Sequence, residues 1–373
     1  MPDASELVEA RRVGHLPQLD GLRGVAIALV LVGHVTQFSL HRFEAMGNFL
    51  AQLGVLLFFV LSGFLITSII AAEKRNHGTV DLPNFYWRRI LRLAPAFLLF
   101  MAAICCLMLK GWIPRIAKYE IAACFLYVRN IVGRSESVAH LWSLSLEEQF
   151  YILWPPVVKF LDSNLLVWVS LGATVALSVW RGVAIALHLF DYNLGIYYMR
   201  PYFRFDSILI GCCLALLLAR GKTVGSALHK MMTSAPLWMV WAAVFAWTLL
   251  GDYISHPIYI SVQMLCVTWL VFRTVTGNYF RWLASPTFRF VGKISYSLYL
   301  WQQIFIVTPY PQWPLVHVFP INVILCFAIA TLSYFGIEKP FLRIKDRGKA
   351  PRNALAAADA TAVPVVDLPS LSK

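Results

Sequence analysis

An arginine and a histidine interrupt the first long apolar segment of the chain, LDGLRGVAIALVLVGHV at residues 19–35. Ten residues separate Arg23 from His34, so a helix turns by about 1100° between them and returns to within about 20° of its starting direction. The two side chains therefore share one helix face, about 16 Å apart along the axis, which is roughly half the thickness of a bilayer's hydrocarbon core. An ionisable side chain at such a depth is costly, and we expect it to face a cavity and to function there.

Three arginines precede the next apolar stretch, in FYWRRILRLAP, and we expect them at the start of the third helix: Arg88, Arg89 and Arg92. Arg89 and Arg92 are three positions apart and so lie on one helix face. One interpretation is that they anchor a cytoplasmic helix end at the lipid phosphates. The other is that their guanidinium groups clamp the phosphates of a ligand.

Two adjacent carboxylates follow a long loop, in LWSLSLEEQFYILWP at residues 141–155. Ser145 and Glu148 have the spacing of a capping box, which predicts a helix beginning near Leu146 and gives Glu148 a structural role. Glu147 has no capping role, although an acid in the first helical turn also suits the helix dipole. Alternatively, Glu147 orients the imidazole of His34, which is expected in the same half of the membrane, and raises its basicity.

A third buried acid is expected in RPYFRFDSILIG, where Asp206 stands close to Arg200 and Arg204. The first interpretation is an internal ion pair that fixes the helix, and the alternative is a role in binding an acceptor substrate.

Two further patterns have both a packing and a functional interpretation. Tyr296, Tyr299 and Trp301, in ISYSLYLWQQ, could line a sugar site, but aromatic residues in membrane helices also form cores and interfaces. Gly63 and Gly211 are interpreted as positions of close helix packing.

The overall composition is typical of a membrane protein. Hydrophobic residues make up 59% of the 373, charged residues only 14%, and the mean hydropathy is +0.66, whereas a soluble domain has about 25% charged residues. We predict an all-α polytopic transmembrane bundle of about ten helices. The apolar segments of spanning length are about 20–40, 50–72, 93–110, 146–161, 164–188, 205–219, 236–251, 255–272, 294–309 and 316–337. Segment 119–132 is too short and charged, and is predicted to be interfacial or re-entrant.

Positive charge predicts the orientation of the bundle. The net charge is +13, but the Lys and Arg residues lie between apolar segments and form no single basic face, so we expect no nucleic-acid partner. With both termini in the cytoplasm, 23 of the 32 Lys and Arg residues lie inside, in agreement with the positive-inside rule.

The chain then divides into a cytoplasmic N-terminal segment (1–18), a membrane domain (19–345) and a disordered cytoplasmic tail (346–373). No cleavable signal is expected at the polar N-terminus. The seven cysteines lie inside apolar segments without metal-ligand spacing, so we expect packing roles, no metal site and no disulfide.

Seven short segments, in order over residues 19–341, resemble acyltransferase family 3, a family of bacterial integral-membrane acyltransferases. They are LDGLRGVAIALVLVGH, FFVLSGFLI, FYWRRILRLAP, LWSLSLEEQFYILWP, RFDSILIG, GKISYSLYLW and GIEKPF. The resemblance implies an O-acyltransferase of the bacterial inner membrane. It would transfer an acyl group, usually acetyl, from cytoplasmic acetyl-CoA to a hydroxyl of a glycan or lipid-linked sugar, with membrane lipids around it and no permanently bound cofactor.

The same resemblance implies roles for individual residues. Arg23 and His34 match the family's R-x10-H pair, and Arg89 and Arg92 match its R-x-x-R. The S-x-x-x-E-x-x-F-Y segment is matched by Ser143, Glu147, Phe150 and Tyr151. Gln302 departs from the family, because many relatives, especially those fused to an extracytoplasmic hydrolase-like domain, have histidine there. We therefore do not expect transfer to a second, soluble domain in this chain.

These matches lead to a hypothetical mechanism in which acyl-CoA passes Arg88, Arg89, Arg92 and Arg23 to reach His34. His34 acts as general base or itself takes the acyl group, and Glu147 holds the imidazole. The candidate acceptor-site residues are Ser143, Tyr151, Asp206 and Tyr299. The length of the acyl chain, the acceptor and the oligomeric state stay open.

Two other functions are alternatives to an acyltransferase. In a proton-coupled transporter of an anionic solute, His34, Glu147 and Asp206 would form a proton relay, with Arg23 and Arg89 binding the solute. A catalytically silent scaffold in an envelope complex would need none of these costly residues.

Overall fold

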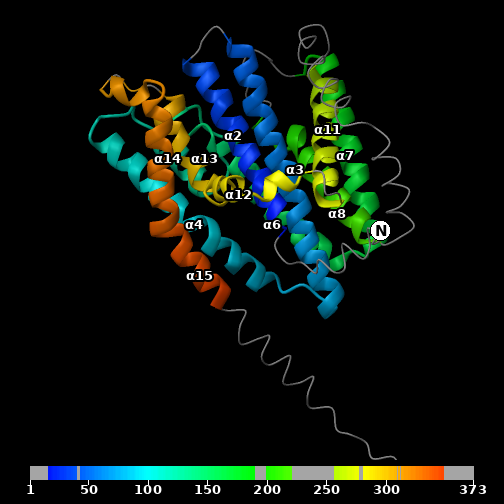
Figure 1. Ribbon diagram of the computed structural model, residues 1–373. Helices are drawn as coiled ribbons and strands as arrows, with labels where there is room; N and C mark the ends of the chain where they lie inside the picture. The colour runs from blue at the N-terminus through cyan, green and yellow to red at the C-terminus, as the bar shows by residue number, and fades with distance from the viewer. Residues whose placement is uncertain are drawn as a thin grey trace, which may run out of the picture.

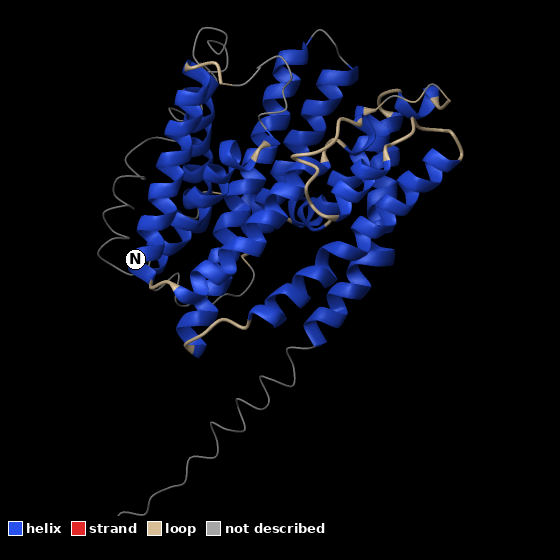
Figure 2. Cartoon of the chain, turned by 180° about the vertical axis from the view of Figure 1, so that it is seen from behind, coloured by secondary structure: helices blue, strands red, loops and turns tan. Residues whose placement is uncertain are grey.

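The computed structural model describes residues 16–39, 43–189, 199–220, 256–276, 280–308, 310 and 312–347. Within that part of the chain all regular structure is helical (Figures 1 and 2). The longer helices are α2 (Pro17–Ser39), α3 (Glu44–His77), α4 (Leu82–Leu109), α6 (Leu141–Phe160), α7 (Ser163–Ala186), α8 (Pro201–Ala219), α11 (His256–Thr276) and α14 (Ile321–Ser333). The shorter ones are α5 (Lys118–Phe125), η2 (Glu136–Val138), η5 (Arg281–Ala284), α12 (Pro286–Lys293), α13 (Ser295–Gln302), η6 (Gln303–Val307), η7 (Pro314–His317), η8 (Tyr334–Glu338) and α15 (Lys339–Arg347).

Six helical segments of the described residues are long and apolar enough to cross a membrane. They are α2, α3, α4, α7, α8 and the continuous run of α14, η8 and α15. The prediction of an all-α membrane bundle is confirmed. The count of ten spans is not confirmed: six of the ten predicted spans are found among the described residues. The predicted span at 236–251 lies outside the described residues, as do almost all of the proposed N-terminal segment and C-terminal tail.

The predicted span at 294–309 is not one straight helix. It is divided into α13 and the π-helix η6, and α12 stands before it. A second π-helix, η8, interrupts the last membrane segment. Single π-turns inside helices often occur at functional sites, because they redirect the side chains beside them.

Two predicted helix starts are wrong, and both errors move functional residues inward. Helix α4 begins at Leu82, where the side chain of Asp81 caps the amide of Asn84, so Arg89 and Arg92 lie inside the helix. Helix α6 begins at Leu141, so Ser145 cannot cap it; its hydroxyl donates to the carbonyl of Leu141 instead.

A side-chain cap is found at the start of the next helix, α7, where Asp162 accepts hydrogen bonds from the amides of Leu165 and Asn164. These two backbone bonds hold the pKa of the Asp162 carboxyl below its ordinary value.

Helix α3 lies at the centre of the bundle, between α2 and α8. A Cβ atom on Gly63 would lie 1.9 Å from the carbonyl oxygen of Ile208, and one on Gly211 would lie 2.1 Å from that of Val60. Any larger residue would force α3 and α8 apart, so the prediction of close packing at both glycines is confirmed.

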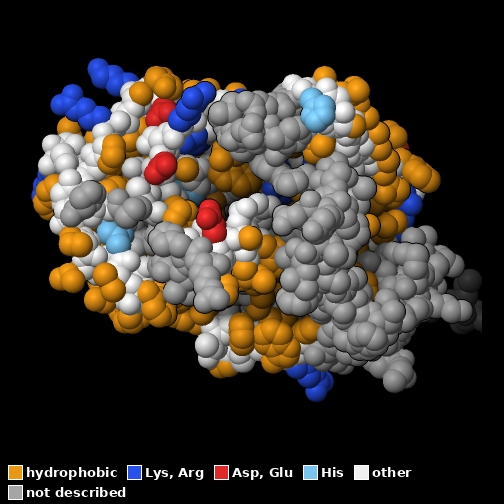
Figure 3. Space-filling model, turned by 90° about the horizontal axis from the view of Figure 1, so that it is seen from above, with side chains coloured by type: hydrophobic (Ala, Val, Ile, Leu, Met, Phe, Trp, Pro, Cys, Tyr) orange, Lys and Arg blue, Asp and Glu red, His pale blue; other side chains and the backbone are white. Residues whose placement is uncertain are grey.

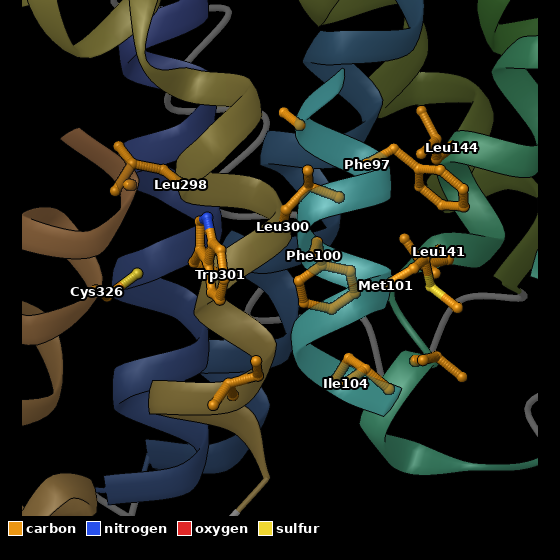
Figure 4. Close-up of a cluster of buried hydrophobic side chains, with 14 of the residues drawn as sticks. Phe97, Phe100, Met101, Ile104, Leu141, Leu144, Leu298, Leu300, Trp301 and Cys326 are labelled. Atoms are coloured by element: carbon orange, nitrogen blue, oxygen red, sulfur yellow. The ribbon is translucent and has the colours of Figure 1, made fainter. Parts of the chain in front are cut away.

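An apolar cluster packs α4, the start of α6, α13 and α14 against one another (Figure 4). Phe100 of α4 lies edge-on to Trp301 of α13, with ring centroids 5.8 Å apart, while Leu141 and Leu144 pack from α6. The cluster fixes α13 relative to α4, which carries the arginines.

Hydrophobic side chains also occupy much of the rim of the molecule seen end-on (Figure 3). Leu98, Leu153 and Trp168 are more than half exposed, which is unfavourable in water but suits helices that face lipid. The chain is a multi-pass membrane protein.

Candidate functional site

A cavity of about 140 Å³ lies between α2, α3, α4, α6 and α13. One wall is a mainly apolar face of α3, and the others carry most of the charged and hydroxyl-bearing residues predicted from sequence. The residues of the α3 wall are Val55, Phe58, Phe59, Leu61, Ser62, Leu65, Ile66 and Ile69. The residues of the other walls are Arg23, Arg89, Arg92, Leu93, Ser143, Leu144, Glu147, Tyr151, Ser295, Tyr296 and Tyr299.

Arg89 is held in place by protein groups on two sides. Its Nε and Nη2 atoms donate to the Glu148 carboxylate at 3.0 and 2.6 Å, and its guanidinium lies 3.3 Å from the centre of the Tyr151 ring. A bidentate pair of this kind is strong and directional. Glu148 is therefore a partner of Arg89 and not the helix cap predicted from sequence, because α6 begins at Leu141 and Glu148 stands two turns inside it.

The other two cavity arginines have a different setting. No carboxylate oxygen of the described residues lies within 4.0 Å of Arg23 or Arg92. Arg92 lies within electrostatic range of the like charges of Arg23 and Arg89, and also of the carboxylate of Glu338. Like charges gathered beside a cavity favour an anionic ligand.

Arg88 is not part of the cavity wall. Its Nη2 atom lies 3.7 Å from a carboxylate oxygen of Glu73, near the turn that connects α3 to α4. This position fits the anchoring interpretation for Arg88, and the clamp interpretation is restricted to the arginines of the cavity.

Glu147 lies on the cavity wall, where its Oε1 atom accepts a hydrogen bond of 3.1 Å from the hydroxyl of Ser62. Ser62 belongs to FFVLSGFLI, but sequence reasoning gave it no role. A polar residue on an otherwise apolar face of α3 was the available signal, and it is this residue that holds the carboxylate.

His34 has a partner other than the one predicted. Its Nδ1 atom lies 2.7 Å from Oε1 of Gln302, whereas Glu147 is bonded to Ser62. The prediction that Glu147 holds the imidazole is therefore wrong for this structure. His34 is also not one of the residues that line the cavity; it lies beside Gln302, one helical turn beyond Tyr299 of the cavity wall.

A compact hydrogen-bonded group lies at the cavity wall. The hydroxyl of Tyr299 donates to the carbonyl oxygen of His140 at 2.6 Å and lies 2.5 Å from Oγ of Ser143. These bonds tie α13 to the first turn of α6. Ser143, Tyr151 and Tyr299 thus lie on one cavity, as expected of a common site.

Asp206 has a structural environment. Its Oδ2 atom lies 2.6 Å from Nη1 of Arg181, and both side chains are almost fully buried. Arg181 also donates to the carbonyl of Phe203 and to the hydroxyl of Ser261, so the pair joins α7, α8 and α11. The prediction of an ion pair was right, but the partner was missed, because Arg181 is 25 residues away in sequence and on another helix.

With this geometry in hand, comparison with known proteins gives one family. A family model described as "Acyltransferase domain" matches residues 16–337. A Staphylococcus aureus (strain COL) protein provisionally named an O-acetyltransferase is 30% identical over 367 residues, covering 89% of this chain and 58% of that protein. The O-acetyltransferase OatA of S. aureus (strain NCTC 8325 / PS 47) is 29% identical over 355 residues, covering 87% of this chain and 57% of OatA.

The chain thus spans less than three fifths of the length of these curated relatives. No solved structure matches the chain with statistical significance.

Proposed function

The chain belongs to the acyltransferase 3 family, and from that membership we propose that it is a membrane O-acyltransferase. It moves an acyl group, acetyl by analogy with its named relatives, from acyl-CoA to a hydroxyl of a glycan or lipid-linked sugar. The observation that carries the proposal is the cavity in which Arg23 and Arg92, without a close carboxylate, face an apolar wall of α3 and the carboxylate of Glu147.

The donor end of the cavity is the one with the arginines. The phosphates of CoA are polyanionic, and guanidinium groups bind phosphate oxygens through paired hydrogen bonds. The apolar α3 wall suits the pantetheine arm, and the distance of about 16 Å from Arg23 to His34 along α2 suits its extended length. Arg89 supports the clamp indirectly, since Glu148 already satisfies two of its donor atoms.

The transfer itself needs a base and a site for the acceptor. A lone pair on His34 takes the proton of the acceptor hydroxyl as its oxygen bonds to the thioester carbonyl carbon. The carbon–sulfur bond then breaks, the electron pair leaves with the CoA sulfur, and the proton passes from His34 to that sulfur. The products are an ester and free CoA. Alternatively, His34 itself takes the acyl group from CoA and then transfers it to the hydroxyl, which gives the same ester and free CoA.

Ser143, Tyr151 and Tyr299 supply hydroxyl groups on the cavity wall and are the proposed acceptor contacts. Glu147 is proposed to act on the reacting groups from the same wall rather than through the imidazole. No permanently bound cofactor or metal is proposed. Asp206 is proposed as a structural residue, because it is paired with Arg181 away from the cavity wall.

We place the protein in the bacterial inner membrane with the arginine end of the cavity toward the cytoplasm, where acyl-CoA is found. The positive-inside rule supports this orientation, because the end of α3 carries Lys74 and Arg75 and the start of α4 carries Arg88. Both termini are then cytoplasmic and His34 lies toward the outer half.

A proton-coupled transporter has less support. It needs His34, Glu147 and Asp206 in one relay, but these side chains contact Gln302, Ser62 and Arg181, respectively.

The test is release of free CoA from acetyl-CoA by the purified protein in liposomes, with and without crude envelope glycan. We expect acceptor-dependent release from the wild type and none from His34→Ala, with both proteins inserted equally. Equal release from the two proteins would remove His34 from the reaction. Absence of release in both, together with proton-coupled solute uptake, would favour the transporter.

A further inference from the structure

Gln302 is the last residue of α13 and stands directly before the π-helix η6. Its side chain is buried, and Oε1 faces Nδ1 of His34 at 2.7 Å across the contact between α13 and α2. The Nε2 atom of the same amide is buried without a hydrogen-bond partner in the described part of the chain. Within the described part of the chain, the side-chain amide of Gln302 therefore has one hydrogen-bond partner, His34.

This contact has a chemical consequence for the imidazole. Oε1 is the amide atom placed toward the ring; a carbonyl oxygen can only accept a hydrogen bond, so in this arrangement Nδ1 carries the proton and donates it to Oε1. In a neutral imidazole the second nitrogen, Nε2, then holds the lone pair. A partner that binds one ring nitrogen thus selects the nitrogen that is free to react.

We propose that Gln302 is a positioning residue that holds His34 in the Nδ1–H tautomer and thereby makes Nε2 the reacting nitrogen. The inference rests on the proposed function, in which His34 takes a proton or an acyl group. It assigns to a neutral amide the orienting role that sequence reasoning gave to the carboxylate of Glu147.

The segment around Gln302 is fixed on both sides, as a positioning role requires. Tyr299, one turn before it, is bonded to the carbonyl of His140. Gln303, directly after it, donates from Nε2 to the carbonyl of Glu136 at 2.6 Å and to the hydroxyl of Thr308 at 3.2 Å. The π-turn that begins at Gln303 lets adjacent glutamines point in different directions, one to α2 and the other to η2.

Two variants separate the acceptor atom from the shape of the side chain. Gln302→Leu keeps a similar volume and removes the acceptor, whereas Gln302→Glu keeps an oxygen at the same reach. Gln52→Leu is the matched control, because Gln52 is a membrane-helix glutamine bonded to Asn48 on α3 and does not line the cavity.

The first readout is independent of catalysis. The full chain is labelled with ¹⁵N-histidine, and the resonances of His34 among the nine histidines are identified by their loss in His34→Gln. We expect a protonated Nδ1 and an unprotonated Nε2 in the wild type, Gln302→Glu and Gln52→Leu. In Gln302→Leu, the Nε2–H tautomer should become populated. A wild-type His34 that is protonated at Nε2 and not at Nδ1 would overturn the proposal.

The second readout is acyl transfer. For Gln302→Leu we expect kcat to fall by about tenfold or more, by analogy with the loss seen when the orienting partners of metal-binding histidines are removed, with the KM for acyl-CoA within about twofold. Gln302→Glu should recover most of the lost kcat. Unchanged kcat in Gln302→Leu, beside an inactive His34→Ala, would reject the role of Gln302 and leave the proposed function intact. An inactive wild type would reject the proposed function, while the tautomer measurement would still decide the role of Gln302.

Discussion

The guanidinium group of Arg89 is bound by the carboxylate of Glu148 through two of its nitrogens, at 3.0 and 2.6 Å. The two residues come from α4 and α6, which both contribute residues to the cavity wall. This pair separates the cavity arginines into two kinds. Arg89 is neutralised and fixes the walls, whereas Arg23 and Arg92 have no carboxylate of the described residues within 4.0 Å.

Removing Glu148 should therefore damage the fold more than removing Glu147. Glu148→Gln leaves the Arg89 charge without its counter-ion and is expected to lower the free energy of unfolding by about 3 kcal/mol, since the loss of one partner of a buried pair is strongly destabilising. Glu147→Gln weakens the bond to Ser62 and removes a charge within electrostatic range of Arg89, but leaves the Arg89–Glu148 pair intact, and should cost about 1 kcal/mol. Denaturant unfolding of both variants in one detergent measures the difference, and equal losses would contradict it.

Arg23→Gln and Arg92→Gln should weaken acyl-CoA binding while leaving the fold intact. A hydrogen bond to a charged group contributes about 1.5–3 kcal/mol, so each variant should raise the Kd for acyl-CoA by about tenfold or more. Arg88→Gln is the control, because Arg88 pairs with Glu73 outside the cavity wall. Calorimetric titration gives the three values. A loss as large in Arg88→Gln as in Arg92→Gln would return the arginines to an anchoring role.

The pair of Glu147 and Ser62 should affect turnover rather than donor binding. Glu147→Gln is expected to lower kcat by about a hundredfold, the lower end of the range for side chains that assist a proton transfer, here the one carried by His34, with little change in the KM for acyl-CoA. Ser62→Ala removes one hydrogen bond to that carboxylate and should lower kcat by about tenfold or less. Steady-state rates of CoA release test both, and a change confined to KM would place Glu147 in donor binding.

Asp206→Asn should lower the amount of folded protein without altering the chemistry of the part that folds. Both side chains of the Arg181–Asp206 pair are buried, and breaking such a pair costs about 3–5 kcal/mol, whereas replacing both members with apolar residues can be neutral. The double variant Arg181→Met, Asp206→Leu should therefore recover stability relative to Asp206→Asn. Normal stability with reduced acceptor turnover in Asp206→Asn would instead support a role in acceptor binding.

The sequence predicts part of the cavity wall. Arg23, Arg89, Arg92 and Glu147 follow from residue spacing and family motifs, and all four line one space, whereas His34 does not line it. The membrane class and the glycine contacts between α3 and α8 followed from composition and residue size.

The pairings within the site could not be predicted, because they depend on helix boundaries and on contacts between distant segments. Helix α6 begins five residues earlier than its capping pattern indicated, which moved Glu148 from the helix terminus to Arg89. Gln302 is 268 residues from His34, and the π-turn that follows it has no periodic signature. The Arg181 partner of Asp206 could not be predicted for a similar reason, since it lies 25 residues away on another helix while Arg200 and Arg204 are closer in sequence.

The central claim is that His34 transfers an acyl group to an acceptor hydroxyl, and the most direct measurement follows the acyl carbon. Proteoliposomes with wild type or His34→Ala are given acetyl-CoA labelled with ¹³C in the acetyl group, together with envelope glycan, and the glycan is analysed by mass spectrometry before and after mild alkali. We predict an alkali-labile ¹³C-acetyl ester on the glycan with the wild type and none with His34→Ala. Equal labelling by the two proteins, or release of CoA without any labelled ester, would contradict the account.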